Sequence, residues 1–373
     1  MKIGIITIHR SPSYGGSLQA YALYKYLSNI GHDVEIIDLL RPTHQEYKYS
    51  FKYHKMRIGF LKYVKNTIFA ILRLKSRRHD PEAYNENFVL FNNKIRLSKT
   101  YKSIDELYKN PPVYDVYITG SDQVWNPAQP YALEPYFLTF VRSGRKVSYA
   151  ASVGLLELLP AEKRKFKLWI ENYDYVSVRE SSIKQYLESF VNKQIRRVAD
   201  PSFLLKRKEW QSISKKPNLS GYILLFELKH NQELFKFCMQ LSIQSGKRLV
   251  VLGQKEPVSP NNSFMVVKDA GPLEFIGFIA NADMVITDSF HGTVFSIIMN
   301  TQNFYTYIAK GNKKGSRIID LLNQFNIPDH LLDTSLMQTW DELSHNKIDR
   351  EVVDGCYNKE QQQSQDYLNK CLI

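Results

Sequence analysis

Residues 285–296 of the chain read VITDSFHGTVFS, a stretch that combines the end of an apolar strand with the start of a helix. The apolar run stops at Asp288 and Ser289, and a helical pattern of apolar residues resumes after Gly292. We expect Asp288 or Ser289 to cap this helix, which places His291 near backbone N–H groups that also attract anions. A histidine there can pass a proton to a substrate near neutral pH. The alternative is a histidine that only hydrogen-bonds to a carbonyl at the helix start.

The alternation of strand and helix continues along the whole chain. Short runs rich in β-branched residues, such as KIGIITI at 2–8, YDVYITG at 114–120 and GYILLFEL at 221–228, are separated by helical stretches. Many of these runs lack alternating polar residues, which is typical of parallel strands that are buried on both faces. The pattern predicts a doubly wound α/β architecture, with two Rossmann-like domains and parallel sheets that face one interdomain cleft.

The length of 373 residues suits two such domains. A polar stretch with proline and glycine, KRKEWQSISKKPNLSG at 206–221, marks the expected boundary. We predict an N-terminal domain at 1–205 with a basic helical insertion at about 41–100, and a C-terminal domain at 219–330. Residues 331–373 are predicted to form a helical tail that packs back on the N-terminal domain.

Composition favours a soluble cytoplasmic protein. Hydrophobic residues make up 43% of the chain and charged residues 23%, as in ordinary globular proteins. Cys238, Cys356 and Cys371 are odd in number and far apart, so they predict neither a disulfide framework nor a zinc site. The opening residues MKIGIITIHR pass directly into a strand, so no signal peptide is expected. The longest run without charged residues, 289–309, has a polar middle that argues against a membrane span.

Basic residues are concentrated in one segment. Residues 41–80 hold eleven Lys and Arg against two acidic residues, which gives +9 of the total net charge of +13. A solvated helical insertion is the first interpretation. The second is a cationic amphipathic helix at a membrane surface, and the third is nucleic-acid binding, for which no recognition motif is present.

A glycine turn follows the first predicted strand, in SPSYGGSLQAYALYKYL at 11–27. Gly15 and Gly16 precede a helical apolar pattern, so free N–H groups and the positive end of the helix dipole would be exposed there. That arrangement suits a phosphate or carboxylate, although an ordinary strand-to-helix turn explains the residues equally well. The spacing is not GxGxxG, so the nicotinamide fingerprint is absent.

Polar residues also gather after the strand YDVYITG, in GSDQVWNP at 120–127. Ser121, Asp122 and Gln123 follow this strand directly, at the edge where open α/β sheets bind ligands. Trp125 and Asn126 would offer an aromatic face and an amide to a sugar. The alternative for Asp122 is that it caps the next turn.

Two further groups of cations are candidates for anion binding. Arg179 ends the strand VSVRE and either contacts a ligand or pairs with Glu180. In AKGNKKGSRIIDLL at 309–322, Lys310, Lys313, Lys314 and Arg317 lie in a glycine-containing loop before a helix. Loop lysines of this kind are more often simply solvated.

Taken together, these motifs resemble the bacterial polysaccharide pyruvyl transferase family. The similarity covers roughly residues 1–325 and rests on YGGSLQAYAL, DVYITGSDQVWNP, VSYAAS, VSVRE, ADPSFLL, VITDSFHGTVFS and GSRIIDLL, in that order. The combination of GSDQVWNP with SFHGT is the specific part. The resemblance implies a GT-B-like fold of two Rossmann-type domains with no cofactor or metal. It also implies transfer of a pyruvyl group from phosphoenolpyruvate to two sugar hydroxyls, which forms a pyruvate ketal and releases phosphate.

One position departs from the family pattern. Other branches carry an arginine two residues before the histidine, and Ser289 stands there in this chain. Another cation would have to replace that arginine, and Arg317 is the first candidate, followed by Arg179.

The resemblance and the motifs together assign expected roles. His291 is the expected general acid, and Asp122 is the base or the group that orients a hydroxyl. The remaining candidates contact the donor (Arg317, Ser289, Gly292, Lys310, Lys314 and Arg179) or the acceptor (Tyr14, Gly15, Gly16, Gln19, Ser121, Gln123, Trp125 and Asn126).

The expected acceptor is a lipid-linked glycan at the inner face of the cell membrane, where the basic segment would contact anionic lipid. No nucleic-acid partner is expected. Two alternatives remain open: a GT-B glycosyltransferase that uses a nucleotide-sugar, and a non-catalytic relative that binds a glycan or a membrane.

Overall fold

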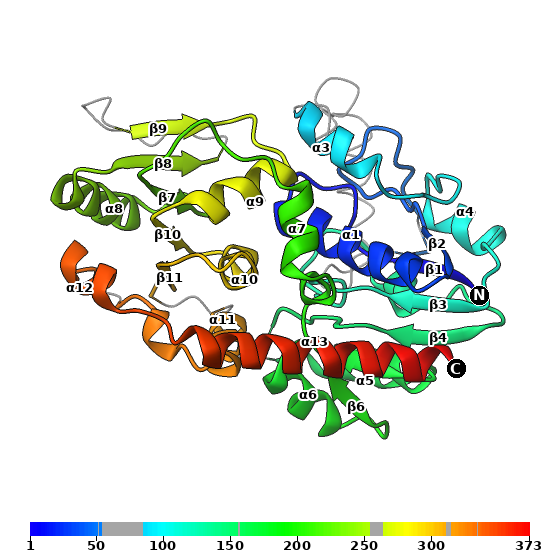
Figure 1. The fold of residues 1–373 in the computed structure, drawn as a ribbon. Coiled ribbons are helices and arrows are strands. Elements are labelled where there is room, and N and C mark those ends of the chain that lie inside the picture. Colours follow the sequence, from blue (N-terminus) through cyan, green and yellow to red (C-terminus); the bar gives the residue numbers. More distant parts are fainter. Residues whose placement is uncertain (51, 54–84, 156, 254–263, 311–314, 334) are drawn as a thin grey trace. The chain divides into compact units, whose positions relative to one another are not determined.

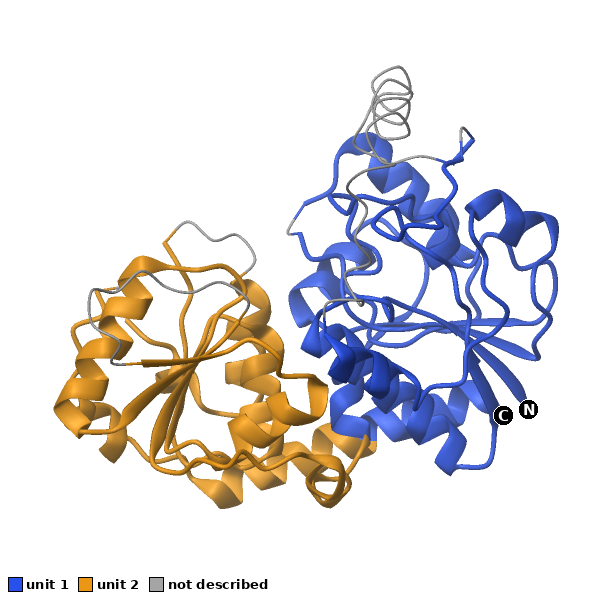
Figure 2. Ribbon diagram, turned by 90° about the horizontal axis from the view of Figure 1, so that it is seen from above, with its two compact units in different colours: residues 1–204, 363–373 blue, residues 205–362 orange. Residues whose placement is uncertain are grey.

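The structure is a computed structural model that describes residues 1–50, 52–53, 85–155, 157–253, 264–310, 315–333 and 335–373. The chain divides into two compact units, shown in Figure 2: unit 1 comprises residues 1–204 and 363–373, and unit 2 comprises residues 205–362. Most of the predicted basic insertion, residues 54–84, lies outside the described residues.

Unit 1 contains a parallel sheet in the order β2-β1-β3-β4 (Figure 1). Its strands are β1 (Lys2–Ile6), β2 (Asp33–Ile36), β3 (Val116–Thr119) and β4 (Arg145–Ser148). A second, two-stranded parallel sheet joins β5 (Val176–Val178) to β6 (Ile195–Arg197). All four residues of β3 are buried, as expected for a strand between two helical layers.

The helices of unit 1 follow the strands in the α/β manner. Those that the structure describes are α1 (Tyr14–Asn29), α3 (Glu86–Asn92), α4 (Ile104–Lys109), α5 (Pro160–Glu171) and α6 (Ser181–Glu188), with 3-10 turns η2 (Glu134–Phe137) and η3 (Pro201–Leu204). Three of the five start at a side-chain cap, from Ser13, Asn85 and Ser103, each of which accepts a hydrogen bond from an N–H of the first turn.

Unit 2 contains a five-stranded parallel sheet in the order β11-β10-β7-β8-β9. Its strands are β7 (Tyr222–Phe226), β8 (Arg248–Leu252), β9 (Phe264–Val267), β10 (Met284–Thr287) and β11 (Phe304–Thr306). Numbered within the unit, this order is 3-2-1-4-5, the Rossmann arrangement. β7 and β10 are buried at every residue, so the centre of the sheet forms the core of this unit.

The helices of unit 2 are α7 (Arg207–Ile213), α8 (Gln232–Ser245), α9 (Pro272–Asn281), α10 (Phe290–Ile298), α11 (Ser316–Gln324) and α12 (Trp340–His345), with the 3-10 turn η4 (Pro328–His330). α7 arises from part of the polar stretch at 206–221 that marks the expected boundary. Among the described residues, no helix is long and apolar enough to cross a membrane.

The C-terminal helix α13 (Arg350–Leu372) is the long red helix of Figure 1. Its last part belongs to unit 1, where Ser364 Oγ accepts a hydrogen bond from the Ala199 N–H at 2.9 Å. The Tyr367 hydroxyl donates to the Ser148 carbonyl at 2.9 Å, and Leu368 and Cys371 are fully buried. Residues 363–373 therefore complete the core of unit 1.

Candidate functional site

The strand order places a topological switch point in each sheet. In unit 1 the chain leaves β1 for β2 on one side and for β3 on the other, and in unit 2 β7 has β8 on one side and β10 on the other. Ligands of open α/β sheets bind outside the carboxyl ends of the strands at such points. The sequence motifs fall there: Asp122 follows β3, and Asp288 and His291 follow β10.

In unit 2, α10 starts with a serine cap. Ser289 Oγ accepts the Gly292 N–H at 3.3 Å, while the Ser289 N–H donates to Thr287 Oγ1 at 3.0 Å. Gly292 is required by packing, because a Cβ atom there would lie 2.4 Å from Thr287 Oγ1. Ser289 and Gly292 thus shape the helix start that the sequence predicts, and their roles toward a donor stay predictions.

His291 lies in the first turn of α10 and is 9% exposed. Its ring meets the Phe290 ring edge-on, with centroids 5.2 Å apart. The Arg317 guanidinium, from the first turn of α11, lies over the same Phe290 ring at 5.9 Å. The structure therefore gathers the predicted acid and the predicted replacement cation around one phenylalanine at the end of β10.

Asp288 carries the clearest electrostatic perturbation of this region. Burial raises its pKa to about 6, helped by the charge of Glu227, although the Leu228 N–H donates to Asp288 Oδ1 at 2.7 Å. A carboxyl with this pKa exchanges its proton in mildly acidic solution, which suits proton transfer better than an ordinary aspartate. The sequence suggests Asp288 only as a helix cap, and the cap is Ser289.

A histidine and a glutamate lie beside Asp288 at the end of β7. His230 Nδ1 and Glu227 Oε1 are 2.6 Å apart, and the hydrogen bond to Glu227 raises the pKa of His230. Sequence analysis misses this pair, although the motif FELKH directly after a buried strand is a signal for it.

The loop after β11 contributes one described lysine. Lys310 is exposed, and Lys314 lies outside the described residues together with Lys313. Of the four cations predicted to bind an anion in this loop, the structure describes Lys310 and Arg317.

In unit 1, the glycine turn forms the first turn of α1. Ser13 Oγ accepts the Gly16 N–H at 3.3 Å, Gly15 and Gly16 are buried, and the Tyr14 ring stacks on Phe88 at 5.2 Å. Gln19 is fully buried, and its amide nitrogen donates to Thr7 Oγ1 and to the Gly16 carbonyl, both at 3.0 Å. Gln19 thus links α1 to the end of β1. Its side chain exposes no atom that could make the acceptor contact that the sequence predicts.

Asp122 has an unusual backbone conformation for a residue with a side chain, with φ of +66°. Such strain persists only where the surroundings enforce it, and its carbonyl accepts N–H groups from Val124 at 2.8 Å and from Ser152 at 3.0 Å. None of the hydrogen bonds and salt bridges found among the described residues involves its half-buried carboxylate, although its charge acts on the Arg179 guanidinium. This carboxylate is free to meet a hydroxyl, and its role as a base stays a prediction.

The predicted sugar contact of Trp125 is wrong. Trp125 is fully buried, it stacks on Phe137 with centroids 4.7 Å apart, and its indole N–H donates to the Tyr136 carbonyl at 2.9 Å. A flat aromatic surface of this size lowers the free energy more in the core than at a wet edge.

The neighbours of Trp125 also hold the loop together. Ser121 is fully buried and donates to the Ala150 carbonyl at 2.8 Å, and Asn126 donates to Gln123 Oε1 at 2.6 Å. Gln123, which is half-buried, keeps the more accessible side chain of the three.

Arg179 is an ion-pair partner rather than a free cation. Its guanidinium, 3% exposed, donates to Glu180 Oε1 at 3.1 Å and to Asp200 Oδ2 at 2.8 Å. Two buried carboxylates therefore already balance its charge, which corrects the prediction that Arg179 binds the donor.

A polar network that the sequence analysis misses lies at the carboxyl ends of β1 and β2. Asp38 Oδ1 is 3.0 Å from His9 Nε2 and accepts Arg10 Nε at 2.6 Å, while Thr100 donates to Oδ2 at 2.6 Å. Burial alone would raise the pKa of Asp38, but the hydrogen bonds from Arg10, His9 and Thr100 hold it well below its usual range. His9 and Arg10 directly follow the first apolar strand in KIGIITIHR, and polar residues at such a position indicate a candidate site at the carboxyl end of the strand.

Within the described ranges, no group of three or more His, Cys, Asp and Glu side chains is arranged to hold a metal ion.

The fold and these switch-point sites define a GT-B-like α/β protein. The structure resembles UDP-N-acetylglucosamine 2-epimerase from Rickettsia bellii, with a TM-score of 0.52, 9% identity and coverage of 100% of this chain and 96% of that one. It also resembles UDP-GlcNAc 2-epimerase from Methanocaldococcus jannaschii, with a TM-score of 0.50, 12% identity and coverage of 97% and 93%. At these identities the likeness concerns the fold alone, and it confirms the fold class expected from the sequence.

The sequence identifies the family. A family model described as polysaccharide pyruvyl transferase matches residues 14–307, which is most of the chain. The chain therefore belongs to the polysaccharide pyruvyl transferase family, an enzyme family whose name implies a polysaccharide acceptor. No curated protein matches the sequence.

Proposed function

We propose that the protein transfers a pyruvyl group from phosphoenolpyruvate to two hydroxyls of one sugar, with release of phosphate and formation of a pyruvate ketal. The observation that carries the proposal is the cluster at the start of α10, where His291 and Arg317 flank Phe290 at the switch point of the unit 2 sheet. The family match supplies the reaction class.

The chemistry requires a proton donor and cations. Protonation of the methylene carbon of phosphoenolpyruvate turns it into a methyl group and makes the adjacent carbon electrophilic. A sugar hydroxyl adds to that carbon and gives up its proton to a base. A second hydroxyl then displaces phosphate, and its proton leaves with the phosphate, so that the donor and one diol yield one ketal and one phosphate.

We assign the proton donor to His291 and the donor's negative charges to Arg317 and Lys310, with the N–H groups of the capped α10 start beside them. Arg317 supports this assignment because it occupies the neighbourhood of Ser289, where other branches of the family carry an arginine. Asp122 is the proposed base, since its carboxylate has no hydrogen-bond partner among the described residues.

Phosphate release with phosphoenolpyruvate and a panel of glycans tests the assignment. His291→Ala should lower turnover by about 10²–10⁴-fold, the usual contribution of positioned proton transfer. His345→Ala, a change at an exposed histidine in α12 of the same unit, is the matched control and should retain full turnover. Unchanged turnover in a folded His291→Ala variant would remove His291 from the mechanism.

A nucleotide-sugar glycosyltransferase is the second candidate, favoured only by the GT-B-like fold. Ligand-detected NMR with phosphoenolpyruvate and a panel of sugar nucleotides separates the two. Binding of phosphoenolpyruvate supports the first proposal, and binding of only the sugar nucleotides contradicts it.

We further propose that the acceptor is lipid-linked and that residues 41–80 contact anionic lipid at the cytoplasmic face of the membrane. The support is the net charge of +9 in this segment, since each cation near an anionic surface contributes about 1 kcal/mol of attraction. Charge-reversed variants of the lysines and arginines at 48–65 should lose binding to anionic vesicles. Equal binding by these variants would refute the placement.

A further inference from the structure

A cavity of about 520 Å³ lies in unit 1. Its walls come from the start of β1 at Lys2, from residues 98–101, from residues 109–113 before β3 and from residues 142–143 before β4. Tyr117, the second residue of β3, also lines the cavity, whereas Asp122 lies beyond the carboxyl end of that strand.

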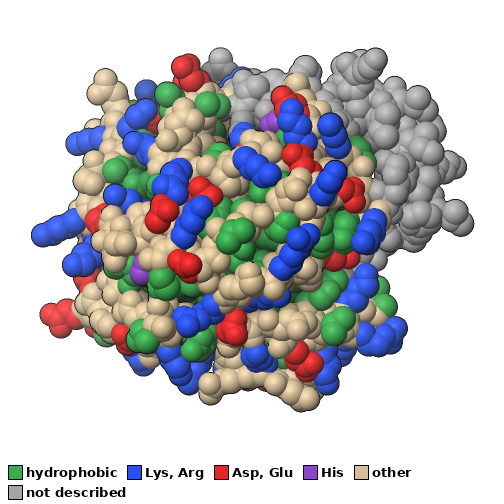
Figure 3. All heavy atoms as spheres, turned by 90° about the vertical axis from the view of Figure 1, so that its right-hand side faces the viewer, with side chains coloured by type: hydrophobic (Ala, Val, Ile, Leu, Met, Phe, Trp, Pro, Cys, Tyr) green, Lys and Arg blue, Asp and Glu red, His purple; other side chains and the backbone are tan. Residues whose placement is uncertain are grey.

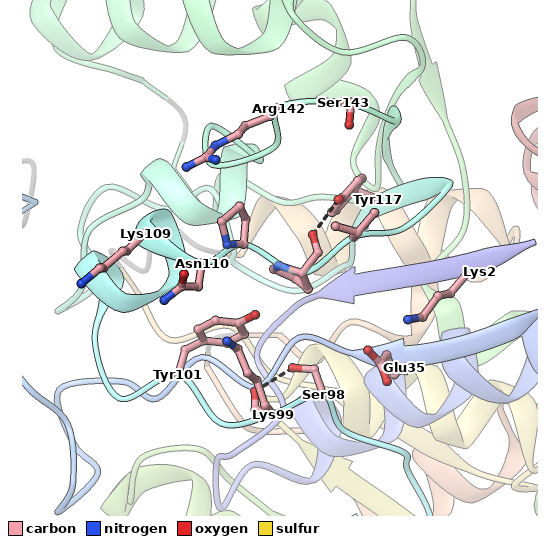
Figure 4. A pocket seen from close by; sticks show the side chains of 13 residues that line it. Lys2, Glu35, Ser98, Lys99, Tyr101, Lys109, Asn110, Tyr117, Arg142 and Ser143 are labelled. Carbon is pink, nitrogen blue, oxygen red and sulfur yellow. Dashed lines mark hydrogen bonds between the residues drawn. The ribbon is translucent and has the colours of Figure 1, made fainter.

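The walls of the cavity carry a positive charge. Lys2, Lys99, Lys109 and Arg142 line it, and Figure 4 shows that they come from different segments of unit 1. Glu35 is the one carboxylate among the lining residues, all of which the structure describes. Its oxygens accept the Tyr114 hydroxyl and lie 3.5 Å from the Arg96 guanidinium, which also pairs with Asp33 at 2.6 Å.

Two of these lysines are held in place by aromatic rings. Lys99 Nζ lies 4.9 Å from the centre of the Tyr101 ring, and Lys2 Nζ lies 5.3 Å from the centre of the Tyr114 ring. Cation–π contacts of this kind restrict long side chains that would otherwise move freely in solvent. The cations of the cavity are therefore partly preorganised.

Tyr101 provides an independent indication of a ligand. Its side chain is fully buried and lines the cavity, yet its hydroxyl has no hydrogen-bond partner among the described residues. Figure 4 shows Tyr101 in the middle of the lining side chains. Burial raises the pKa of Tyr101 to about 12, so the hydroxyl keeps its proton and can donate. A buried donor without an acceptor destabilises the protein, and a bound acceptor removes this cost.

The cavity differs from the surface around it. On the face shown in Figure 3, Lys and Arg side chains are spread among Asp and Glu side chains. Among the residues that line the cavity, four are cations and one is a carboxylate, and Tyr101 adds a neutral donor. Pro111 and Pro112 add apolar surface beside these groups, and the volume lies in the usual range for small-molecule sites.

We propose that this cavity binds a phosphate-bearing ligand at a site separate from the proposed donor site of unit 2. Multiple cations and a hydroxyl donor satisfy a multiply charged phosphate, and the two prolines offer contact to a less polar part of the same ligand. The phosphate group belongs either to a soluble phosphate ester or to a lipid headgroup, because both present the same oxygens.

Calorimetric titration of the full-length chain with pyrophosphate at low salt tests the proposal. The double variant Lys99→Gln/Arg142→Gln should weaken binding at least tenfold, since it removes two of the four cations that line the cavity. Tyr101→Phe, which removes only the hydroxyl, should weaken binding about tenfold. The same change should leave the folded protein as stable as before or more stable, so a loss of binding cannot be ascribed to unfolding.

Two controls separate this cavity from other cationic groups. Lys94→Gln changes an exposed lysine of unit 1 outside the cavity and should bind like the parent. Arg317→Gln disables the proposed donor site in unit 2 and should also leave pyrophosphate binding at the cavity intact. The proposal therefore stands or falls separately from the proposed function.

Vesicles that contain phosphatidic acid distinguish the two sources of phosphate. Vesicle binding that is weaker in the double variant than in Lys94→Gln indicates a headgroup, whereas pyrophosphate binding with equal vesicle binding by the two variants indicates a soluble ester. Pyrophosphate affinities of the double variant and of Tyr101→Phe within twofold of the parent would overturn the proposal. Loss of all binding in Arg317→Gln alone would overturn it as well.

Discussion

Replacing Asp288 with asparagine should stabilise unit 2 at neutral pH. The buried carboxyl has its pKa raised from 3.8 to about 6, so its ionised form is less stable in the folded protein than in the unfolded chain. At 1.36 kcal/mol per pH unit, this rise corresponds to about 3 kcal/mol of destabilisation above pH 6. Asparagine removes the charge and keeps an oxygen that can accept the Leu228 N–H, which lies 2.7 Å from the carboxylate.

The sign of the pH dependence follows from the raised pKa. Below pH 3.8 the carboxyl is protonated in both states, and the parent loses no stability. Between pH 3.8 and 6 the unfolded chain releases its proton first, so the parent loses stability as the pH rises. The stability difference between Asp288→Asn and the parent should therefore be about 2 kcal/mol larger at pH 7.5 than at pH 4.5, whatever constant cost the amide brings.

Urea unfolding followed by hydrogen exchange and mass spectrometry measures this difference. Peptides from β7 and β10 report on unit 2 without interference from unit 1. Asp341→Asn, at an exposed aspartate of α12, is the matched control and should show no such change with pH. A stability difference for Asp288→Asn that is equal at the two pH values would refute the burial argument.

Three further changes test the roles that packing assigns. Trp125→Ala should lower the free energy of unfolding, measured in urea, by about 3–5 kcal/mol because it empties a core position. Trp125→Phe should leave the KM for a glycan unchanged. A tenfold higher KM in folded Trp125→Phe would show that the indole contacts the acceptor after all. Gly292→Ala should destabilise by about 1–3 kcal/mol in thermal unfolding, since the added methyl group meets Thr287; a Tm equal to that of the parent would contradict the contact. Arg179→Gln should lower the free energy of unfolding, measured in urea, by about 3–5 kcal/mol because two buried carboxylates lose their cation. A free energy of unfolding equal to that of the parent would show that these ion pairs contribute little.

The fold could be predicted because its signals are local. The strand MVIT is buried at every residue and apolar at its first three, and Ser289 caps α10 shortly after the apolar run ends. Such features depend on a few consecutive residues, so periodicity and capping chemistry suffice to place them.

The electrostatics of the site could not be predicted in the same way. The raised pKa of Asp288 depends on burial and on Glu227 and Leu228, about sixty residues earlier in the chain. His9 meets Asp38 across two strands, and nothing in the sequence names that partner. The polar neighbours of Trp125 predict an exposed loop, whereas its ring is buried against Phe137. That partner comes from a later 3-10 turn, so the local sequence does not indicate the burial.

The division of the chain has a consequence for its synthesis. Unit 2 is continuous from residue 205 to residue 362, whereas the core of unit 1 includes residues 363–373. The ribosome releases the chain from its N-terminus. Unit 2 can therefore reach its native state before residues 363–373 emerge, whereas unit 1 still lacks the hydrogen bonds of the Ser364 and Tyr367 hydroxyls. Until the last turns of α13 emerge, the nascent unit 1 therefore exposes the surface that Leu368 and Cys371 cover in the folded protein, and chaperones bind such exposed surface.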